Sequence, residues 1–291
     1  MRTLHVDSGR EMRGGQWQVV YLLEGMPDAL LLARKESPLF AEAEKRGIVT
    51  KPLSYLELRA QMRRHDLVHA HDARAHTMAS VAGGPPLIVS RRVAFPVKTG
   101  LFSQWKYRHA ALYLAVSKFV ASRLLQAGVP ESKIRVVYDG VPISVPAEPV
   151  PGRVLMLRSK SADLSLNDLA VAAADGEIVW ADDLWRDLHT ASVFVYVSDM
   201  EGLGSGAIAA MSCGVPVVAS GVGGLSEVVE NGESGYFVER SEIASAVRRL
   251  ANDPALAARM GQKARERAVE LFSVDAMRAA TVRAYNEVLS R

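Results

Sequence analysis

Short apolar runs alternate with amphipathic segments along nearly the whole chain, on both sides of a proline-rich stretch. Residues 142–152 read PISVPAEPVPG, with four prolines and no periodicity, which is typical of a linker. Alternation of strands and helices is the pattern of doubly wound parallel sheets. The sequence therefore predicts an α/β fold with two such domains, with ligands at the carboxyl ends of the strands and in the cleft between the domains.

The expected elements follow from periodicity and from turn residues. Before the linker we expect a helix whose N-cap is Ser117 and whose stop is Gly128. The other expected helices there span residues 16–25 and 38–46, and the strands span 3–6, 29–33, 66–71, 87–89, 112–116 and 134–137. After the linker we expect strands at 154–157, 177–180, 193–197 and 215–219, helices at 167–174, 184–190 and 205–211, and helices over most of the last 50 residues.

Composition narrows the class of protein. The 291 residues have a mean hydropathy of +0.06 and no apolar run of the roughly 20 residues that a membrane span needs. The N-terminus does not resemble a signal peptide, so we expect a cytoplasmic protein. The single cysteine, Cys213, forms neither an internal disulfide nor a CxxC metal site, and we expect it to be a small packing residue.

Charge is unevenly distributed. Residues 1–147 carry a net charge of +9 and residues 148–291 carry −6, and no acidic residue lies between Asp72 and Glu131. Basic residues interleaved with aromatic ones in that interval suit a membrane interface, a nucleic acid or a phosphorylated small molecule, and they also suit a merely solvated face. Because no nucleic-acid-binding motif accompanies the charge, we expect no nucleic acid partner.

The strongest signal is residues 196–220, YVSDMEGLGSGAIAAMSCGVPVVAS. Gly202, Gly204 and Gly206 let backbone amides approach a ligand, and the following helix N-terminus favours a phosphate. Glu201 can accept hydrogen bonds from two neighbouring hydroxyls. A nucleotide-sugar site requires a carboxylate that binds the hydroxyls of a polyol, and beside it backbone amides that bind a diphosphate.

This segment resembles the donor domain of the family-four (group 1) retaining glycosyltransferases, which have the GT-B fold of two Rossmann-like domains. The segment GVGGLSEVVENGESGYFV at 221–238 resembles the next block of that family, and FSVDAMRAATVRAYNEVL at 272–289 resembles its helix that crosses back to the first domain. Residues 4–26, 66–76, 86–96 and 113–141 continue the resemblance in family order. It implies an N-terminal acceptor domain at 1–146, a donor domain at 147–271 and a crossover helix at 272–291 that packs on the first domain.

The resemblance also implies roles for individual residues. The catalytic group comprises Glu201, which orients the donor sugar, and Arg91, which stands where many relatives have a histidine and can clamp a phosphate or carboxylate. The residues implied to bind the donor are Gly202, Leu203, Gly204, Ser205, Arg158, Lys160 and Glu227; those on the acceptor side are Gly14, Gly15, Gln16 and His71. The second glutamate of the family motif, which usually holds the ribose, is replaced by Ala209. Structural roles without ligand contact stay open for several of these residues. Arg158 and Lys160 can be solvated loop residues, residues 14–16 can form a turn without a ligand, His71 can be a hydrogen-bonded scaffold residue, and Glu227 can cap a helix.

The implied activity is transfer of a hexose from a nucleotide diphosphate sugar, with retention and without a metal, because Asp182-Asp183 lacks a supporting loop. No cofactor is expected beyond this co-substrate. The acceptor is expected to be anionic or lipid-linked, in cell-envelope or glycoconjugate synthesis, with peripheral association at the inner membrane face. Two alternatives are a weak or inactive relative that binds a nucleotide sugar or a partner protein, and a sugar-nucleotide epimerase of similar architecture.

Overall fold

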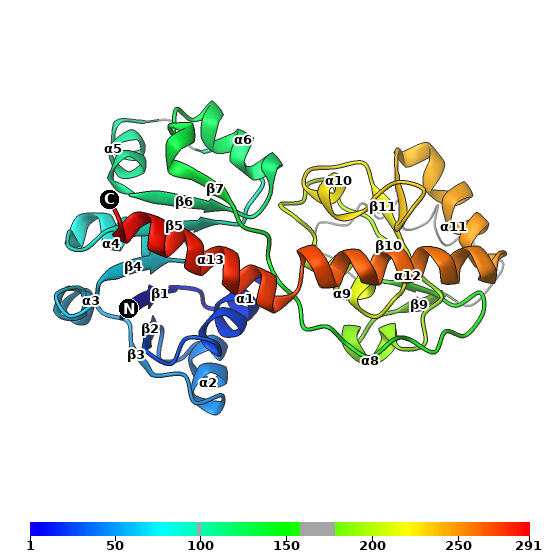
Figure 1. The fold of residues 1–291 in the computed structure, drawn as a ribbon, viewed down its shortest axis with the longest axis horizontal. Helices are drawn as coiled ribbons and strands as arrows, with labels where there is room; N and C mark the ends of the chain where they lie inside the picture. The colour runs from blue at the N-terminus through cyan, green and yellow to red at the C-terminus, as the bar shows by residue number, and fades with distance from the viewer. Residues whose placement is uncertain (98–99, 158–177) are drawn as a thin grey trace. The chain divides into compact units, whose positions relative to one another are not determined.

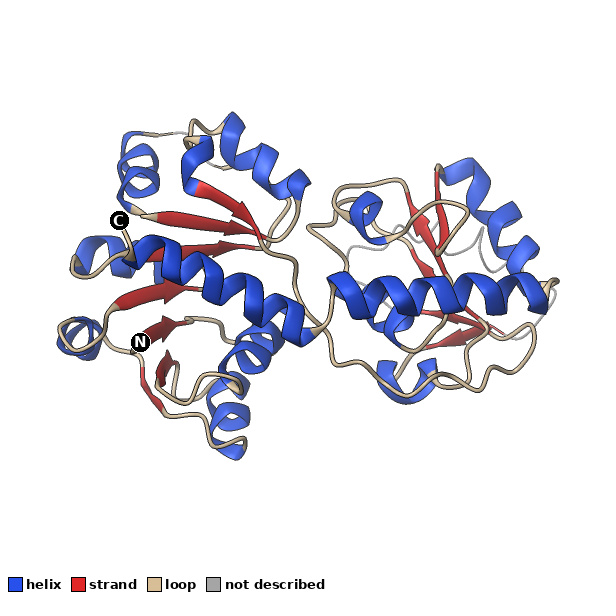
Figure 2. Cartoon of the chain, in the orientation of Figure 1, coloured by secondary structure: helices blue, strands red, loops and turns tan. Residues whose placement is uncertain are grey.

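The computed structural model describes residues 1–97, 100–157 and 178–291, which form two compact units. The first unit comprises Met1–Asp139 and Met277–Arg291, and the second comprises Gly140–Ala276. Each unit is a central sheet with helices packed around it (Figures 1 and 2).

The sheet of the first unit has seven parallel strands in the order β3-β2-β1-β4-β5-β6-β7. Their bounds are β1 Thr3–Val6, β2 Ala29–Ala33, β3 Thr50–Pro52, β4 Leu67–Ala70, β5 Leu87–Arg91, β6 Leu112–Ala115 and β7 Ile134–Val136. β1, β2, β4 and β6 are buried along their whole length, which explains their continuous apolar sequences. The strand order reverses between β1 and β4, so ligands are expected at the carboxyl ends of these two strands.

Side-chain caps fix the start of four helices of the first unit. Ser37, Ser54, Asp72 and Ser117 each accept a hydrogen bond from a backbone amide in the first turn. The helices are α1 Gly14–Leu23, α2 Pro38–Lys45, α3 Tyr55–Met62, α4 Ala73–Ala82, α5 Leu101–His109 and α6 Lys118–Gln126, with a short 3₁₀ helix, η1, at Glu131–Lys133.

The sheet of the second unit has five parallel strands in the order β12-β11-β10-β8-β9. The strands are β8 Val154–Met156, β9 Ile178–Trp180, β10 Val193–Tyr196, β11 Val217–Ser220 and β12 Gly235–Val238. The helices are α8 Leu184–Leu188, α9 Ser205–Ser212, α10 Leu225–Val228, the 3₁₀ helix η2 Arg240–Glu242, α11 Ile243–Ala251 and α12 Pro254–Leu271. Here the order reverses between β8 and β10.

The last helix, α13 (Val274–Leu289), returns the chain to the first unit. It lies across the sheet of that unit in Figure 1. A hydrogen bond joins the hydroxyl of Tyr285 in this helix to Nδ1 of His69 in β4. Arg135 of β7 forms an ion pair with Glu287 of the same helix. These contacts make α13 part of the first unit, although it follows the whole second unit in sequence.

The predicted fold class is confirmed: two Rossmann-like parallel-sheet units and a returning C-terminal helix. The predicted cap Ser117 is also confirmed, since its Oγ accepts from the Val120 amide. β3, α3, α4 and α5 are not among the elements expected from the sequence. α5 buries no residue and α4 buries only alanine, histidine and serine, so neither carries the apolar periodicity by which helices are recognised.

Two further expectations concern the second unit and membranes. The predicted helix at 167–174 lies outside the described residues, and the proline-rich stretch 142–152 contains no helix or strand. None of the described helices has the length and apolar character that crossing a bilayer requires.

Candidate functional site

Glu201 lies in the loop that follows β10 in the second unit. β10 pairs with β8, so this loop leaves the sheet at the point where the strand order reverses. Crevices at the carboxyl ends of strands beside such a reversal are where open α/β sheets bind ligands. The topology therefore puts the predicted donor residues at the ligand edge of this unit.

The Glu201 carboxylate accepts two hydrogen bonds from the protein and can accept others from a ligand. Tyr196 donates its hydroxyl proton to Glu201 Oε2 at 2.9 Å, and the Gly202 amide donates to Oε1 at 3.1 Å. A carboxylate has about four acceptor positions, so two remain for hydroxyls of a ligand. The pKa of Tyr196 is raised by burial and by the neighbouring Glu201 carboxylate, which keeps the phenol protonated and donating.

α9 begins at Ser205, four residues after Glu201. Its N-cap is Gly204, whose φ of +103° lies in the left-handed region, and no side chain caps the helix. The first amides of an uncapped helix lack acceptors and favour an anion. Gly202, Leu203 and Gly204 are themselves buried, while Ser205 at the first helical position is half-buried.

The loop at 221–224 packs backbone to backbone against the Glu201 loop. The Gly224 amide donates to the Glu201 carbonyl at 3.0 Å. A Cβ on Gly224 would lie 2.1 Å from the Gly202 carbonyl oxygen, and one on Gly223 would lie 2.1 Å from that of Glu201. These two glycines therefore allow the close approach that shapes the loop. Glu227 follows in α10, where its amide donates to the Gly224 carbonyl and its carbonyl accepts from Arg267.

The end of β8 reaches the start of α9. A Cβ on Gly206 would lie 3.5 Å from Leu157 Cδ2 and 2.9 Å from a ring carbon of Tyr196. Arg158 and Lys160, the predicted diphosphate contacts, lie outside the described residues. Ala209, at the position of the second motif glutamate, is in α9 and only 2% exposed.

In the first unit, the predicted acceptor-side glycines open α1. The helix begins at Gly14, has no acidic residue in its first turn and has no side-chain hydrogen bond at its N-cap Arg13. Gln16 fixes the preceding loop, because its Nε2 donates to Asp7 Oδ2 at 3.1 Å and its Oε1 accepts from the Arg13 amide at 3.3 Å. Burial and the nearby Asp72 raise the pKa of Asp7.

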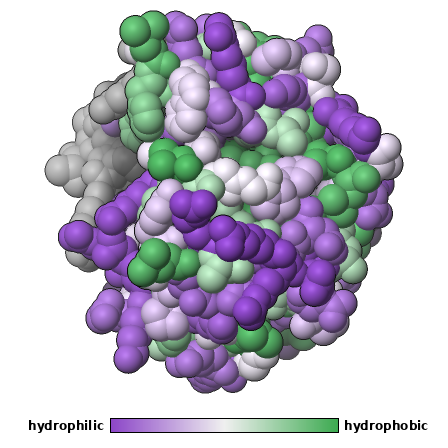
Figure 3. Space-filling view, turned by 90° about the vertical axis from the view of Figure 1, so that its left-hand side faces the viewer, coloured by the Kyte–Doolittle hydropathy of each residue, from purple (hydrophilic) through white to green (hydrophobic). Residues whose placement is uncertain are grey.

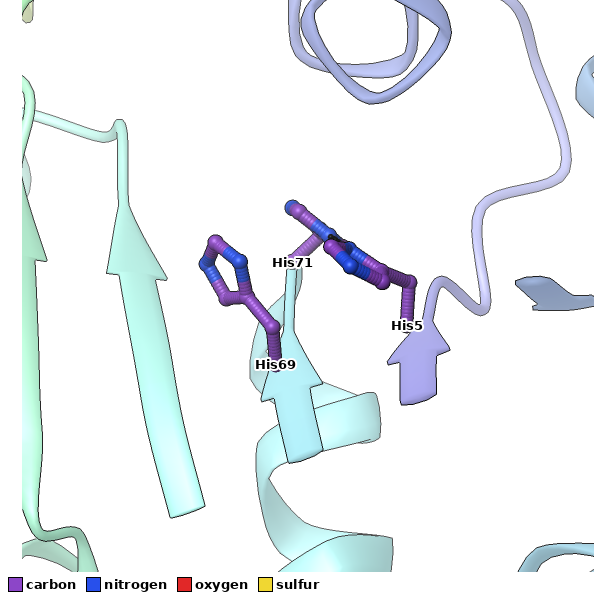
Figure 4. Close-up of side chains that lie close together, drawn as sticks. All are labelled: His5, His69 and His71. Carbon is purple, nitrogen blue, oxygen red and sulfur yellow. Dashed lines mark hydrogen bonds between the residues drawn. The ribbon is translucent and has the colours of Figure 1, made fainter. Parts of the chain in front are cut away.

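His5 of β1 and His69 and His71 at the end of β4 form a buried cluster (Figure 4). Among the described residues these three offer nitrogens within 4.8 Å of one another, the spacing of a candidate metal site. Yet their ring nitrogens already have partners: His5 Nδ1 and His71 Nε2 lie 3.0 Å apart, His5 Nε2 meets Thr3, and His69 bridges Tyr285 and Ser90.

Arg92 fixes the direction of hydrogen bonding in this cluster. Its Nη1 lies 3.5 Å from His71 Nδ1, and arginine only donates, so His71 Nδ1 accepts. His71 Nε2 then donates to His5 Nδ1, and His5 Nε2 donates to the Thr3 hydroxyl. Burial lowers the pKa of His69 and His71, and that of His5 to about 3, so all three are neutral.

The Arg92 guanidinium lies 3.5 Å from His71 Nδ1, and the other ring nitrogens of the three histidines have hydrogen-bond partners. This arrangement fits a hydrogen-bonded scaffold better than a metal site. The cavity lined by His69, Ser90 and Arg92 is about 10 Å³, roughly the space of one water molecule. The buried hydrogen bonds of the cluster support the scaffold alternative for His71, and its acceptor-side role stays a prediction.

Arg91 and Arg92 have different surroundings. Arg91 Nη1 donates to the Tyr107 hydroxyl at 3.0 Å and its Nη2 to the Phe95 carbonyl, so it fastens α5 and the preceding loop. Arg92 instead pairs with Asp139 at 2.8 Å and contacts His71, and a Cβ on Gly15 would lie 3.8 Å from its Cδ. The structure thus brings Gly15 and His71 together around Arg92, which the sequence did not single out.

Tyr196 is the second residue that sequence reasoning missed. It stands inside the strongest motif, five positions before Glu201, and a strand-end tyrosine before a loop carboxylate is the only signal that pointed to it. In sum, Glu201, Gly202, Leu203, Gly204 and Ser205 form one group in the second unit, and Gly14, Gly15, Gln16 and His71 lie near one strand edge of the first.

Comparison with known families matches both halves of the chain. Residues 10–145 match the family described as Glycosyltransferase Family 4, and residues 177–267 match Glycosyl transferases group 1. A D-inositol 3-phosphate glycosyltransferase of Streptomyces bingchenggensis is 40% identical over 111 residues, which are 37% of this chain and 24% of that protein. The alpha-maltose-1-phosphate synthase of Mycobacterium tuberculosis is 38% identical over 110 residues, 35% of this chain and 28% of that protein. The matched segments thus span about a quarter of these relatives.

Solved structures share the fold. Anabaena Alr3699/HepE, crystallised in complex with UDP and glucose, superimposes with a TM-score of 0.85 at 16% identity over 98% of this chain and 99% of that one. Sucrose-phosphate synthase from Thermosynechococcus elongatus gives a TM-score of 0.75 at 16% identity over the full length of both chains. At these identities the likeness establishes the GT-B fold alone.

Proposed function

We propose that this chain, a group 1 glycosyltransferase by both family matches and by its GT-B fold, transfers a sugar from a nucleotide diphosphate sugar to an acceptor. The observation that carries the proposal is the Glu201 carboxylate, oriented by Tyr196 and followed at once by the uncapped start of α9. The relatives are transferases and synthases, which favours an enzyme over an inactive binding protein or an epimerase.

In this proposal the two acceptor positions left on Glu201 bind hydroxyls of the donor sugar. The bond between the anomeric carbon and the phosphate oxygen breaks, and the leaving diphosphate gains negative charge. The amides at the start of α9 stabilise that charge without reorganisation, together with Arg158 and Lys160 as in the family. This requires neither a metal ion nor another cofactor. The acceptor oxygen joins the anomeric carbon with retention of configuration, and its proton passes to the oxygen of the leaving diphosphate.

Ala209 weakens the hold on the nucleotide. The family's glutamate at this position accepts hydrogen bonds from the ribose, and the loss of a charged hydrogen-bond pair costs about 1.5–3 kcal/mol, a factor of roughly ten to a hundred in affinity. We therefore expect this chain to bind a nucleotide such as UDP, the ligand of the HepE complex, roughly ten to a hundred times more weakly than a family member that has the glutamate.

Glu201→Gln tests the donor assignment. The variant keeps the shape of the side chain and removes its charge, so transfer from nucleotide sugars should fall at least tenfold while the melting temperature stays unchanged. Glu233→Gln, an exposed carboxylate of the same unit, is the matched control and should transfer as the wild type does. Full activity of Glu201→Gln would contradict the proposal.

Two finer parts of the proposal need their own measurements. Retention is checked by NMR of the anomeric configuration of the product, where an inverted product would overturn it. Metal independence is checked by adding EDTA, which should leave the rate unchanged.

We also propose that α5 contacts an anionic membrane surface. α5 buries no residue, exposes 88% of Leu101 and 58% of Phe102, and ends in Lys106, Arg108 and His109. No acidic residue lies near it in sequence, between Asp72 and Glu131. On the face of the first unit that bears α3, α4 and α5, apolar side chains form separate groups among hydrophilic ones (Figure 3), as suits adsorption to an interface.

Leu101→Glu tests this contact. The wild type should sediment with phosphatidylglycerol vesicles at low salt, and the variant should remain in the supernatant. Val269→Glu changes an exposed apolar side chain on α12, in the second unit, and should bind as the wild type does. Equal sedimentation of both variants would remove the membrane assignment.

A further inference from the structure

A second pocket opens at the ligand edge of the first unit's sheet, apart from the histidine cluster. It has a volume of about 280 Å³, and its wall includes Ser8, Arg34, Lys35, Leu53, Arg74 and Met78. Ser8 follows β1, Arg34 and Lys35 follow β2, Leu53 follows β3, and Arg74 lies in the first turn of α4. Four segments distant in sequence thus meet at the carboxyl ends of parallel strands, where such sheets bind ligands.

The pocket carries an excess of positive charge. Three cations line it, against the single carboxylate of Glu36, and none of the three forms an ion pair with a residue that the structure describes. Lys35 and Arg74 are exposed, and Arg34 is half-buried. Cations left without a protein partner in a concave site are available to an anionic ligand.

Arg34 is held in place by its own backbone contact. Its Nε donates to the Ser8 carbonyl at 2.8 Å, and its two Nη groups donate to none of the described residues. A guanidinium fixed at Nε presents its remaining donors in a fork that matches a phosphate or carboxylate. The geometry therefore favours a ligand with several anionic oxygens.

The start of α4 does not supply the anion site. Asp72 caps that helix and accepts from the Arg74 and Ala75 amides, and it also accepts from the Ser8 amide and hydroxyl. Anion recognition here rests on the side chains of Arg34, Lys35 and Arg74. Leu53 and Met78 form an apolar wall beside them, against which a small carbon skeleton can pack.

We propose that this pocket binds the phosphate group of a small, soluble phosphate ester that serves as the sugar acceptor. The volume lies just below the roughly 300–1,000 Å³ of typical small-molecule sites, which favours a small ligand. The assignment of this ester as acceptor rests on the proposed glycosyl transfer, whereas binding of the ester does not.

The test uses the full chain, with glycerol 3-phosphate and glucose 6-phosphate as probes and glucose as the uncharged match. Titration calorimetry should detect both esters at low salt and should detect no binding of glucose. Lys35→Gln combined with Arg74→Gln changes exposed side chains only, and should weaken ester binding at least tenfold. Arg63→Gln, an exposed arginine at the end of α3, should bind as the wild type does.

Titration with UDP in the same samples separates the two proposals. UDP binding should be equal in all variants, because the donor residues belong to the other unit. If the esters bind and UDP does not, the phosphate pocket stands and the donor assignment fails. The pocket is refuted if the wild type binds neither ester, if it binds glucose equally well, or if the double variant binds the esters with unchanged affinity.

Discussion

His76 makes the stability of the first unit depend on pH in a way that one substitution can isolate. The side chain is 1% exposed, and its ring meets those of Tyr107 and Tyr113 edge-on, at centroid distances of 5.2 and 5.8 Å. Its Nε2 has no hydrogen-bond partner among the residues that the structure describes. Burial, with Lys106 and Arg91 nearby, lowers the pKa of His76 from 6.5 to about 3. The folded protein therefore keeps this ring neutral over the pH range in which the unfolded chain protonates it.

The sign and size follow from linkage. Between pH 6.5 and pH 3 the unfolded state binds one more proton at this position than the folded state, so the free energy of unfolding falls as the pH falls. The slope approaches about 1.4 kcal/mol per pH unit per histidine. Between pH 7 and pH 5 the loss from His76 amounts to about 2 kcal/mol, and His5, His69 and His71 act in the same direction.

His76→Phe keeps an aromatic ring against the stacked pair of Tyr107 and Tyr113 and removes the titrating group. Urea unfolding at pH 7 and at pH 5 gives the free energy of unfolding of each protein, and only its change with pH is compared. The change should be smaller in the variant by about 2 kcal/mol. His109→Phe removes a histidine that is exposed and should leave the wild-type change intact. If His76→Phe and the wild type lose the same free energy between the two pH values, the reasoning is wrong.

Two further substitutions probe the donor loop. Tyr196→Phe removes the hydroxyl that orients Glu201 without changing the ring, so kcat/KM for transfer should fall about tenfold with an unchanged melting temperature, and an unchanged kcat/KM would deny Tyr196 a positioning role. Gly224→Ala drives a methyl group against the Gly202 carbonyl and should cost about 1–3 kcal/mol in the free energy of unfolding, measured in urea, whereas Gly100→Ala has open space and should cost far less; equal losses would refute the packing argument.

The sequence predicts the fold well because its elements depend on local patterns. Continuous apolar strands, capping serines and turn glycines are readable from neighbouring residues, and the Ser117 cap lies where that pattern predicts. The roles of Gly223 and Gly224 are not readable in this way. Their need for glycine comes from the Glu201 loop, some 20 residues away, whose carbonyls they approach.

Arg91 shows a limit of motif matching at strand ends. Successive side chains at the end of a strand point to opposite faces, so two adjacent arginines reach different neighbours. Arg91 fastens α5 through Tyr107, and Arg92 reaches His71 and Asp139. A resemblance that aligns one position does not indicate which neighbours each arginine reaches, whereas the hydrogen bonds of the folded chain do. The catalytic role implied for Arg91 stays a prediction.

The same reasoning explains why the glycine-rich loop after β10 is easier to recognise in the sequence than the cationic pocket. The loop after β10 needs particular backbone conformations, and these require glycines at fixed positions. The glycines and the Glu201 carboxylate therefore lie within a few residues of each other in the sequence. The cationic pocket requires no special backbone: Arg34, Lys35 and Arg74 are ordinary residues after two strand ends and in one first helical turn, and only the parallel sheet brings them together. Acceptor preference in a chain of this fold can therefore change through single charges that leave no motif, and the charge excess of residues 1–147 is the one sequence feature that anticipates the pocket.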